Sequence, residues 1–249
     1  MKIIDAYWEK RNLGLDAYEI CLDNDDVKKL DEIIKIVSSD KYNKAYLVIK
    51  MPVPNIEALH YLEDNGFSFM EIQFHMVKSL KNYTLPVAEP HLKHFLEQRE
   101  IKKYEEDWKA FVDLMTDNMF HSDRIYLDPK WAKGTSCKRY KNWIMDLVNN
   151  PESHLFAYYH QDIPVGFGLI KINEKNKIAD ILLEGIFEQY QGQGFGYRMV
   201  DCALKKYQNL GIEKVETARS SNNLPMLNLD YLFAFKIKKL EYVLRKFNN

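Results

Sequence analysis

Three glycines at alternate positions open what reads as a helix near the end of the chain. They are Gly192, Gly194 and Gly196, in the segment EQYQGQGFGYRMV, and they follow directly on the strand-like run KIADILLEGIF. Glycine leaves the amide N–H groups of a helix's first turn uncovered, and these donors, at the positive end of the helix dipole, bind anions. The segment therefore predicts a phosphate-binding turn between a strand and a helix.

The spacing of these glycines separates three phosphate-binding patterns. A P-loop ends in Gly-Lys-Ser/Thr, whereas Gly196 is followed by Tyr-Arg. The dinucleotide pattern G-x-G-x-x-G/A is not completed from either Gly192 or Gly194. The third pattern, Q/R-x-x-G-x-G/A, is met by Gln191, Gly194 and Gly196. An ordinary glycine-rich turn is the plain alternative.

Helix-like and strand-like segments alternate around this turn. Apolar residues recur at helical spacing over 105–119 and again over 137–150, and each set falls on one helical face. A hairpin is predicted over 154–174, and further strands over 178–187 and 213–219. This order indicates an α/β (α+β) fold with a mixed central sheet flanked by helices.

The glycine segment resembles motif A of the GNAT N-acetyltransferase superfamily, in which these amides bind the pyrophosphate of acetyl-CoA. The resemblance covers about residues 98–249. It implies a GNAT fold, acetyl-CoA as co-substrate and no metal. The cofactor-binding positions it implies are Ile186, Phe187, Gln191, Gly192, Gln193, Gly194, Phe195, Gly196, Tyr197 and Asn223.

A second family signature, N-x-x-A-x-x-L-Y-x-x-x-G-F, is similar to the stretch that begins at Asn223. Asn223, Leu229 and Phe235 match it, whereas Asp230 stands at the usual tyrosine and Ala234 at the usual glycine. The departure at Asp230 bears on catalysis, because that tyrosine is the family's usual general acid.

The N-terminal half repeats part of the same signature. Asn55, Ala58, Gly66 and Phe67 have the N-x-x-A and G-F spacing, but no Q-x-x-G-x-G precedes them. We therefore expect a truncated, non-catalytic GNAT-like domain over 1–88 and a catalytic domain over 98–249, with the boundary in the proline-containing segment 79–97. A coincidental helix-turn-strand is the alternative.

The segment HSDRIYLDPKW, followed by YKNWI, resembles the S-R-F-x-x-D-P…W-I pattern of bacterial enzymes similar to dTDP-fucosamine acetyltransferase, with Asp123 as an insertion. That resemblance implies that the acceptor is the amino group of a nucleotide-linked deoxyamino sugar, with Arg124 and Tyr126 as substrate-binding residues. The lysines that follow form, as the alternative, a solvated helix face. An amine of a protein, peptide or polyamine is the runner-up acceptor, and a non-catalytic acyl-CoA-binding module is the other alternative.

Acetyl transfer needs a base for the attacking ammonium and a proton for the departing thiolate. The family pattern implies Asp180 as the base, with Glu184 on the same strand face as the alternative, and a backbone N–H near Ile186 that polarises the thioester carbonyl. For the acid, three possibilities stay open: a protonated Asp230, Tyr231 in a changed register, or solvent.

Composition limits the remaining classes of function. The 249 residues are 46% hydrophobic and carry a formal net charge of -1, which gives no reason to expect nucleic acid or an anionic membrane as partner. No apolar run approaches the roughly 18 residues of a membrane span, and no signal peptide is recognisable. Three scattered cysteines predict neither disulfides nor a zinc site. We expect a cytoplasmic enzyme, monomer or homodimer, acting on a small-molecule amine.

Overall fold

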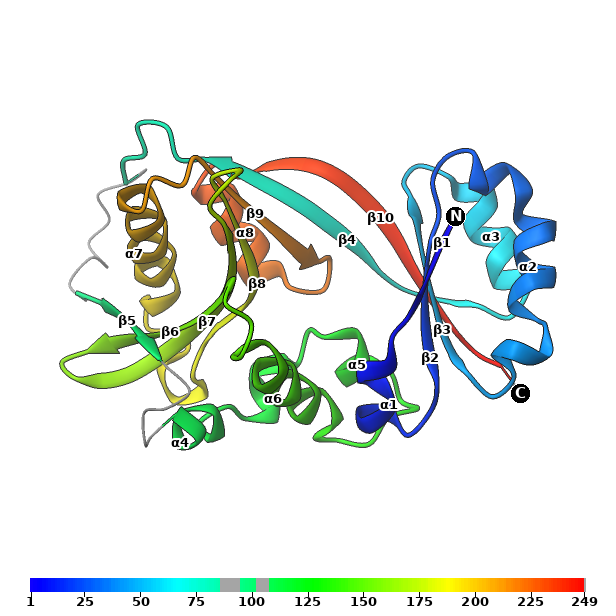
Figure 1. Ribbon diagram of the computed structural model, residues 1–249, viewed down its shortest axis with the longest axis horizontal. Coiled ribbons are helices and arrows are strands. Elements are labelled where there is room, and N and C mark those ends of the chain that lie inside the picture. The colour runs from blue at the N-terminus through cyan, green and yellow to red at the C-terminus, as the bar shows by residue number, and fades with distance from the viewer. Residues whose placement is uncertain (86–94, 102–107, 249) are drawn as a thin grey trace.

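A computed structural model describes residues 1–85, 95–101 and 108–248 of the chain (Figure 1). Within those ranges, ten strands form one mixed sheet in the order β1-β2-β3-β10-β4-β9-β8-β7-β6-β5. The strands are β1 (Lys2–Asp5), β2 (Ala17–Cys21), β3 (Tyr46–Pro52), β4 (Ser68–Ser79), β5 (Glu97–Ile101), β6 (Ser153–His160), β7 (Ile163–Asn173), β8 (Ile178–Ile186), β9 (Lys214–Ser220) and β10 (Lys236–Phe247). The expected mixed sheet flanked by helices is confirmed.

The helices lie on both faces of this sheet (Figure 1). They are α1 (Tyr7–Leu13), α2 (Leu30–Val37), α3 (Ile56–Asp64), α4 (Trp108–Asp113), α5 (Arg124–Leu127), α6 (Thr135–Leu147), α7 (Phe195–Asn209) and α8 (Leu224–Leu232), with a 3-10 turn η5 at Glu188–Tyr190. The helix expected over 105–119 ends earlier than the pattern indicates, at Asp113, and the first three residues of the expected range lie outside the described residues.

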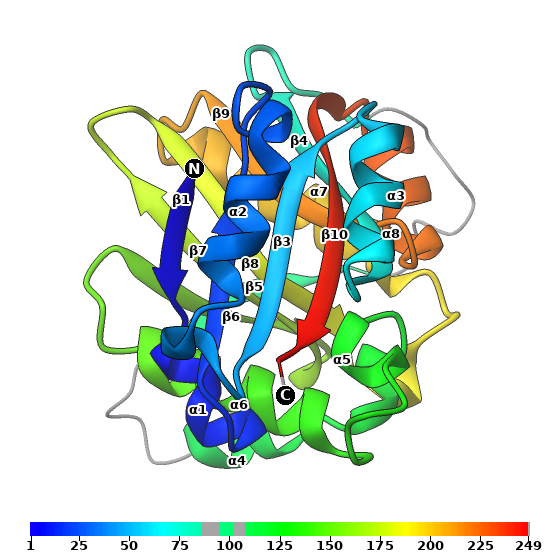
Figure 2. The same cartoon turned by 90° about the vertical axis from the view of Figure 1, so that its right-hand side faces the viewer.

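The N-terminal part of the molecule consists of β1, β2 and β3 with helices α1, α2 and α3. Helices α2 and α3 cover one face of these strands, as Figure 2 shows, and bury their apolar stripes there. In α2 the spacing of Leu30, Ile33 and Val37 places all three in that core. The opposite face packs against Ile125 of α5 and the residues around α1.

The C-terminal part consists of β5 to β9 with helices α4 to α8. Helix α7 packs on one face of these strands through Val200, Leu204 and Tyr207, whose spacing is helical. Helices α4 and α6 pack on the other face. The predicted hairpin forms β6 and β7, and its two turn residues, Gln161 and Asp162, both have positive φ, as a tight turn between twisted strands requires.

Two long strands, β4 and β10, join the two parts. Strand β10 lies between β3 and β4, and β4 pairs in turn with β9. The last strand of the chain therefore completes the sheet of the N-terminal part. The division into domains over 1–88 and 98–249 stays a prediction, and much of its boundary segment, residues 86–94, lies outside the described residues.

A buried ion pair fixes β10 to the segment after α5. The Asp128 carboxylate is 1% exposed, and Arg245 of β10 donates to it from Nε at 2.8 Å and from Nη2 at 3.3 Å. Lys238, on the same strand, pairs with Glu216 at the surface. The two pairs differ mainly in burial.

We expect Arg245→Ala to lower the free energy of unfolding by about 3 to 5 kcal/mol, because it leaves a buried carboxylate without its cation. Lys238→Ala, the matched control, should cost less than about 1 kcal/mol, as exposed pairs do. Urea denaturation of both variants measures the difference. Equal losses would contradict the assignment of Asp128 to a structural role.

Candidate active site

Strands β8 and β9 separate part of the way along their length. They pair in parallel only from Ile178↔Lys214 to Ile181↔Thr217, although β8 continues to Ile186 and β9 to Ser220. The two strands therefore splay apart after this pair. Beyond the last pair, their facing peptide groups are left without partners from the neighbouring strand, and an extended ligand backbone can supply such partners.

The direction of the Ile186 peptide follows from its register. Phe187 N–H donates to Val165 O at 2.9 Å, so residues 187 and 165 form a hydrogen-bonded antiparallel pair. The adjacent pair, Ile186↔Gly166, is then of the non-hydrogen-bonded kind, and the Ile186 N–H points away from β7 into the opening beside β9. This orientation is the one that the predicted oxyanion role needs.

The glycine segment forms a turn that leads from β8 into α7. Gly192 and Gly194 have φ values of 73° and 84°, in the region that favours glycine, and α7 begins directly afterwards at Phe195. The Gln191 side chain donates to Ile186 O at 3.0 Å, and the Gln193 side chain donates to Gln189 O at 2.8 Å. Both glutamines therefore hold the shape of the turn.

The positions expected from sequence to bind the cofactor differ in their surroundings. The side chains of Phe187, Phe195 and Tyr197 are buried in the core, so only their backbone groups are available at the turn. A Cβ on Gly196 would lie 3.3 Å from Leu229 Cδ1 of α8, so a larger residue there requires the leucine side chain to shift. Asn223 is the N-cap of α8, where its side chain accepts from Met226 N–H at 3.3 Å.

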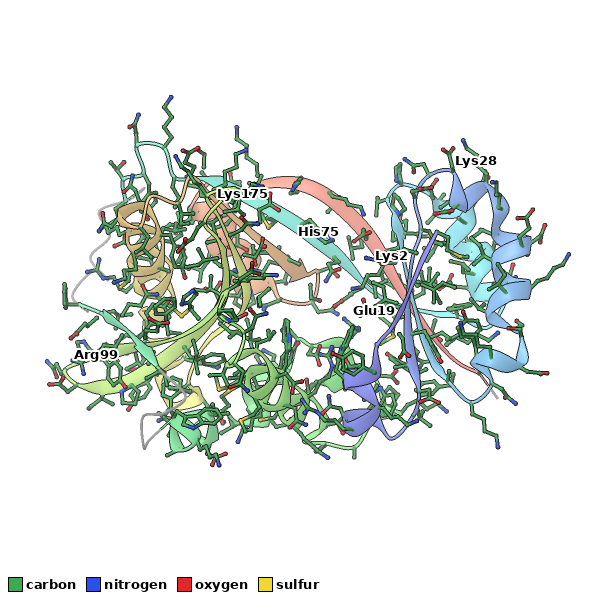
Figure 3. All side chains as sticks on the ribbon, in the orientation of Figure 1. Lys2, Glu19, Lys28, His75, Arg99 and Lys175 are labelled. Carbon is green, nitrogen blue, oxygen red and sulfur yellow. The ribbon has the colours of Figure 1, made fainter. Side chains whose placement is uncertain are left out.

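A cleft of about 380 Å³ lies where the two parts of the molecule face each other. Its walls include β8 and β9 beyond the point of separation, together with α1, β2, β3, β4 and α6. Figure 3 shows Glu19 of β2 on the side that faces the C-terminal part. The charged lining comprises six acids and five bases, namely Glu9, Glu19, Glu71, Asp123, Asp146, Glu184, Arg11, Lys50, Arg124, Arg139 and Arg219.

Asp180 and Glu184 do not share a face of β8, and that prediction was wrong. Asp180 lies opposite Lys171 of β7 and Glu184 lies opposite Gly168, three residues away, because a bulge interrupts the pairing between them. Glu184 therefore points to the α7 and α8 side and lines the cleft, while Asp180 points to the other side and is not among the lining residues. Burial and the neighbouring Glu216 raise the pKa of Asp180.

Glu184 belongs to a buried group of three charges. Arg219 of β9 donates from Nη2 to Glu184 and from Nε to Asp230 Oδ2, the latter at 2.8 Å, so the guanidinium bridges β8 and α8. Burial raises the pKa of Glu184 above its ordinary value, Arg219 opposes that shift, and Asp230 adds to it. The same arrangement raises the pKa of Arg219, since the two carboxylates outweigh the effect of burial.

Neither expected acid is placed to donate a proton. Asp230 is fully buried, and its Oδ2 accepts from Arg219 Nε at 2.8 Å. Tyr231 is 84% exposed on the surface of α8 and is not among the residues that line the cleft. The structure thus does not support a role in catalysis for Tyr231.

Arg219 is the site residue that sequence reasoning missed. A signal for it existed, because Val215, Thr217 and Arg219 alternate along the strand predicted over 213–219, and the structure buries all three. An arginine in such a row requires a buried carboxylate. Asp230, the residue that departs from the family pattern, is one of its two partners.

The expected substrate-binding residues, Arg124 and Tyr126, both lie on α5, but only one of them lines the cleft. Arg124 lines the cleft, whereas Tyr126 is 38% exposed and is not part of the lining. In the basic run after Asp128, Arg139 also reaches the cleft, where its Nε donates to Glu9 at 2.5 Å. Lys130, Lys133, Lys138 and Lys141 do not line the cleft, as expected of a solvated face.

The described ranges contain neither a candidate metal site nor a candidate membrane span. There, no three or more His, Cys, Asp or Glu side chains are grouped as metal ligands would be. No helix in the same ranges has the length and apolar character that crossing a membrane requires.

We expect Arg219→Met to lower the free energy of unfolding by about 3 to 5 kcal/mol near neutral pH, because two buried carboxylates lose their cation. Arg219 lowers the pKa of Glu184, so its removal raises that pKa further, and protonation of the carboxylate at lower pH then relieves more of the cost in the variant than in the unmodified protein. The deficit relative to the unmodified protein should therefore shrink between about pH 7.5 and pH 5. Urea denaturation at both values measures it, and a deficit independent of pH would contradict the coupling.

Comparisons with known proteins agree with this fold. The crystal structure of a functionally unknown conserved protein from Staphylococcus epidermidis is 14% identical, with a TM-score of 0.62 over 94% of this chain and 85% of that chain. A GCN5-related N-acetyltransferase from Sphaerobacter thermophilus is also 14% identical, with a TM-score of 0.58 over 88% of this chain and 64% of that chain. An acetyltransferase of the GNAT family from Colwellia psychrerythraea is 14% identical, with a TM-score of 0.50 over 88% and 72%.

The sequence itself matches a family model. No curated protein matches the chain. Residues 108–229, which run from α4 to α8, match the acetyltransferase (GNAT) family. The matched segment covers just under half of the chain, and the shared fold agrees with it; together they support an N-acetyltransferase.

Proposed function

We propose that the protein transfers the acetyl group of acetyl-CoA to the amine of a small polar molecule held in the cleft. The observation that carries this proposal is the meeting of the cleft with the opening between β8 and β9. An acceptor in the cleft reaches that opening from one side of the sheet. The Ile186 N–H points into the same opening from β8.

Bound acetyl-CoA would supply an activated thioester. The residues that would hold it are the turn from Gln191 to Tyr197, whose amides lie at the start of α7, and the facing edges of β8 and β9. The Ile186 N–H would stabilise negative charge on the thioester oxygen. Because neither Asp230 nor Tyr231 is placed as an acid, we assign protonation of the thiolate to solvent.

Gly194→Ala tests the phosphate-binding turn. Gly194 and Gly211 both have strongly positive φ, 84° and 78°, so alanine at either position should cost about 1 kcal/mol of stability. Of these two glycines, only Gly194 lies in the turn before α7. We expect its substitution to weaken acetyl-CoA binding at least tenfold by calorimetry, while Gly211→Ala leaves the Kd unchanged. Equal Kd values for the two variants would argue against this turn as the phosphate site.

We propose Glu184 as the group that accepts the proton of the amine, directly or through a water. Of the two carboxylates on β8 it is the one that lines the cleft. Its raised pKa brings it nearer to that of a base acting at neutral pH. Arg219 fixes the position of its carboxylate.

The rate of coenzyme A release with a panel of amines tests the role of Glu184 as the base. We expect Glu184→Gln to lower kcat by about 10² to 10⁴ with little change in KM for acetyl-CoA, and Asp180→Asn to leave kcat near that of the unmodified protein. The reverse ranking would assign the base to Asp180. Acetyl-CoA binding without release for any amine would instead identify a non-catalytic acyl-CoA-binding module.

For the acceptor we propose the amino group of a nucleotide-linked deoxyamino sugar. The lining carries nearly equal numbers of acids and bases, and such a molecule carries both an ammonium group and a diphosphate. A polyamine carries cations only, and would favour a cleft dominated by acids. The panel therefore includes dTDP-, UDP- and GDP-linked amino sugars, spermidine and a peptide amine, and the highest kcat/KM identifies the acceptor class.

A further inference from the structure

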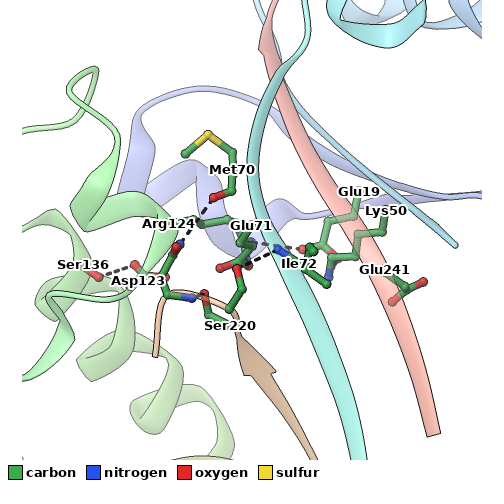
Figure 4. Close-up of polar contacts among 12 residues, drawn as sticks. Glu19, Lys50, Met70, Glu71, Ile72, Asp123, Arg124, Ser136, Ser220 and Glu241 are labelled. Carbon is green, nitrogen blue, oxygen red and sulfur yellow. Dashed lines mark hydrogen bonds and ion pairs between the residues drawn. The ribbon is translucent and has the colours of Figure 1, made fainter. Parts of the chain in front are cut away.

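One wall of the cleft is a row of three charged side chains from distant segments of the chain. Arg124 of α5 lies between Glu19 of β2 and Glu71 of β4, as Figure 4 shows. All three line the cleft. Both carboxylates precede the segment that matches the GNAT family.

Arg124 is held by charge but not by hydrogen bonds to these carboxylates. Its Nη2 lies 3.7 Å from Glu19 Oε1 and its Nη1 lies 3.7 Å from Glu71 Oε1, beyond hydrogen-bond distance. Its Nε is buried and has no hydrogen-bond partner among the described residues. A guanidinium has five N–H donors, and leaving buried donors unused costs free energy. The guanidinium lines the cleft and therefore has donor capacity that these carboxylates do not use.

The position of Glu71 is fixed by the strands around it. Ile72, the next residue, donates its N–H to Ser221 Oγ at 3.0 Å and accepts from Ser221 N–H at 2.8 Å. Ser221 directly follows β9, one of the two strands that form the opening. Glu71 is thus anchored beside the end of β9.

The charges of the row are balanced. Lys50 donates to Glu19 at 3.0 Å, so two cations accompany two carboxylates. Burial alone would raise the pKa of Glu19, but Lys50 and Arg124 outweigh it and hold the pKa below its ordinary value. Glu71 and Glu19 raise the pKa of Arg124 against the opposing effect of burial. Arg124 and Glu19 are therefore charged at neutral pH.

This pattern discriminates among ligand groups. An anion that approached Arg124 would also meet Glu19 and Glu71, and an ammonium that approached the carboxylates would meet Arg124 and Lys50. A hydroxyl group both donates and accepts, so it bonds a carboxylate and a guanidinium at once without adding charge. Adjacent hydroxyls on one ring match the alternation of acceptor, donor and acceptor along the row.

We propose that Glu19, Arg124 and Glu71 form a site for the hydroxyl groups of a sugar-like ring in the acceptor. Side chains of β2, β4 and α5 then select the acceptor, while β8, β9 and the turn before α7 carry the acetyl-transfer groups. Trp8 and Trp143 also line the cleft and offer flat apolar surfaces for the ring. The inference rests on the proposed function only in taking this cleft as the acceptor site.

Calorimetry without acetyl-CoA tests the site with two amines of similar ring size. Glucosamine carries ring hydroxyls and cyclohexylamine carries none. We expect glucosamine to bind at least tenfold more tightly. Glu71→Gln should weaken glucosamine binding about tenfold, because one hydrogen bond to a charged group is lost. The same variant should leave cyclohexylamine binding unchanged.

Two further variants keep the test decisive. Glu19→Gln, at a less buried carboxylate, should have the same selective effect if Glu71→Gln fails to fold, as judged by thermal unfolding. Glu213→Gln, whose carboxylate pairs with Lys177 away from the cleft lining, should change neither affinity. Equal affinity for the two amines, or an equal loss of both in the variants, overturns the proposal.

The outcome is independent of acetyl transfer. Selective glucosamine binding without coenzyme A release would leave the hydroxyl site standing and overturn the proposed enzyme activity. Coenzyme A release at equal kcat/KM for glucosamine and cyclohexylamine would support the enzyme and overturn the hydroxyl site.

Discussion

The separation of β8 from β9 is the constraint on which the candidate site depends. Two parallel strands that stop pairing inside a sheet expose peptide N–H and C=O groups, which must find other partners. Here the last pair is Ile181↔Thr217, and the register with β7 turns the Ile186 N–H into the gap. Two further features lie at this opening. One is the bulge in β8, and the other is the buried Arg219 of β9, which pairs with Glu184 of β8.

The long strands β4 and β10 give the opening its second wall. Because β10 pairs with both β3 and β4, the sheet continues without interruption from the N-terminal part into the C-terminal part. The N-terminal part is therefore a component of the cleft, to which it contributes Glu9, Glu19 and Lys50. A fold that kept only the segment matching the family, residues 108–229, would lack these side chains.

The departure from the family pattern at Asp230 has a structural counterpart. A fully buried aspartate needs a cation, and Arg219 supplies it while also binding Glu184. The aspartate at this position thus completes a buried ionic network that joins β8, β9 and α8. We infer that the carboxylate on β8 and the residue at the tyrosine position work as one unit here.

The sequence by itself determined the local features. Alternation and helical periodicity placed the strands and helices of the C-terminal part, and the glycine spacing located the turn before α7, because these depend on neighbours a few residues apart. Only the tertiary structure decided which charges meet. A one-residue bulge, invisible to periodicity, put Asp180 and Glu184 on opposite faces, and the insertion of β10 between β3 and β4 brought the two parts into one sheet. Arg124 contacts Glu19 and Glu71, and each of these residues is more than fifty positions away in the chain. Such contacts follow from the order of the strands in the sheet, which local sequence patterns do not specify.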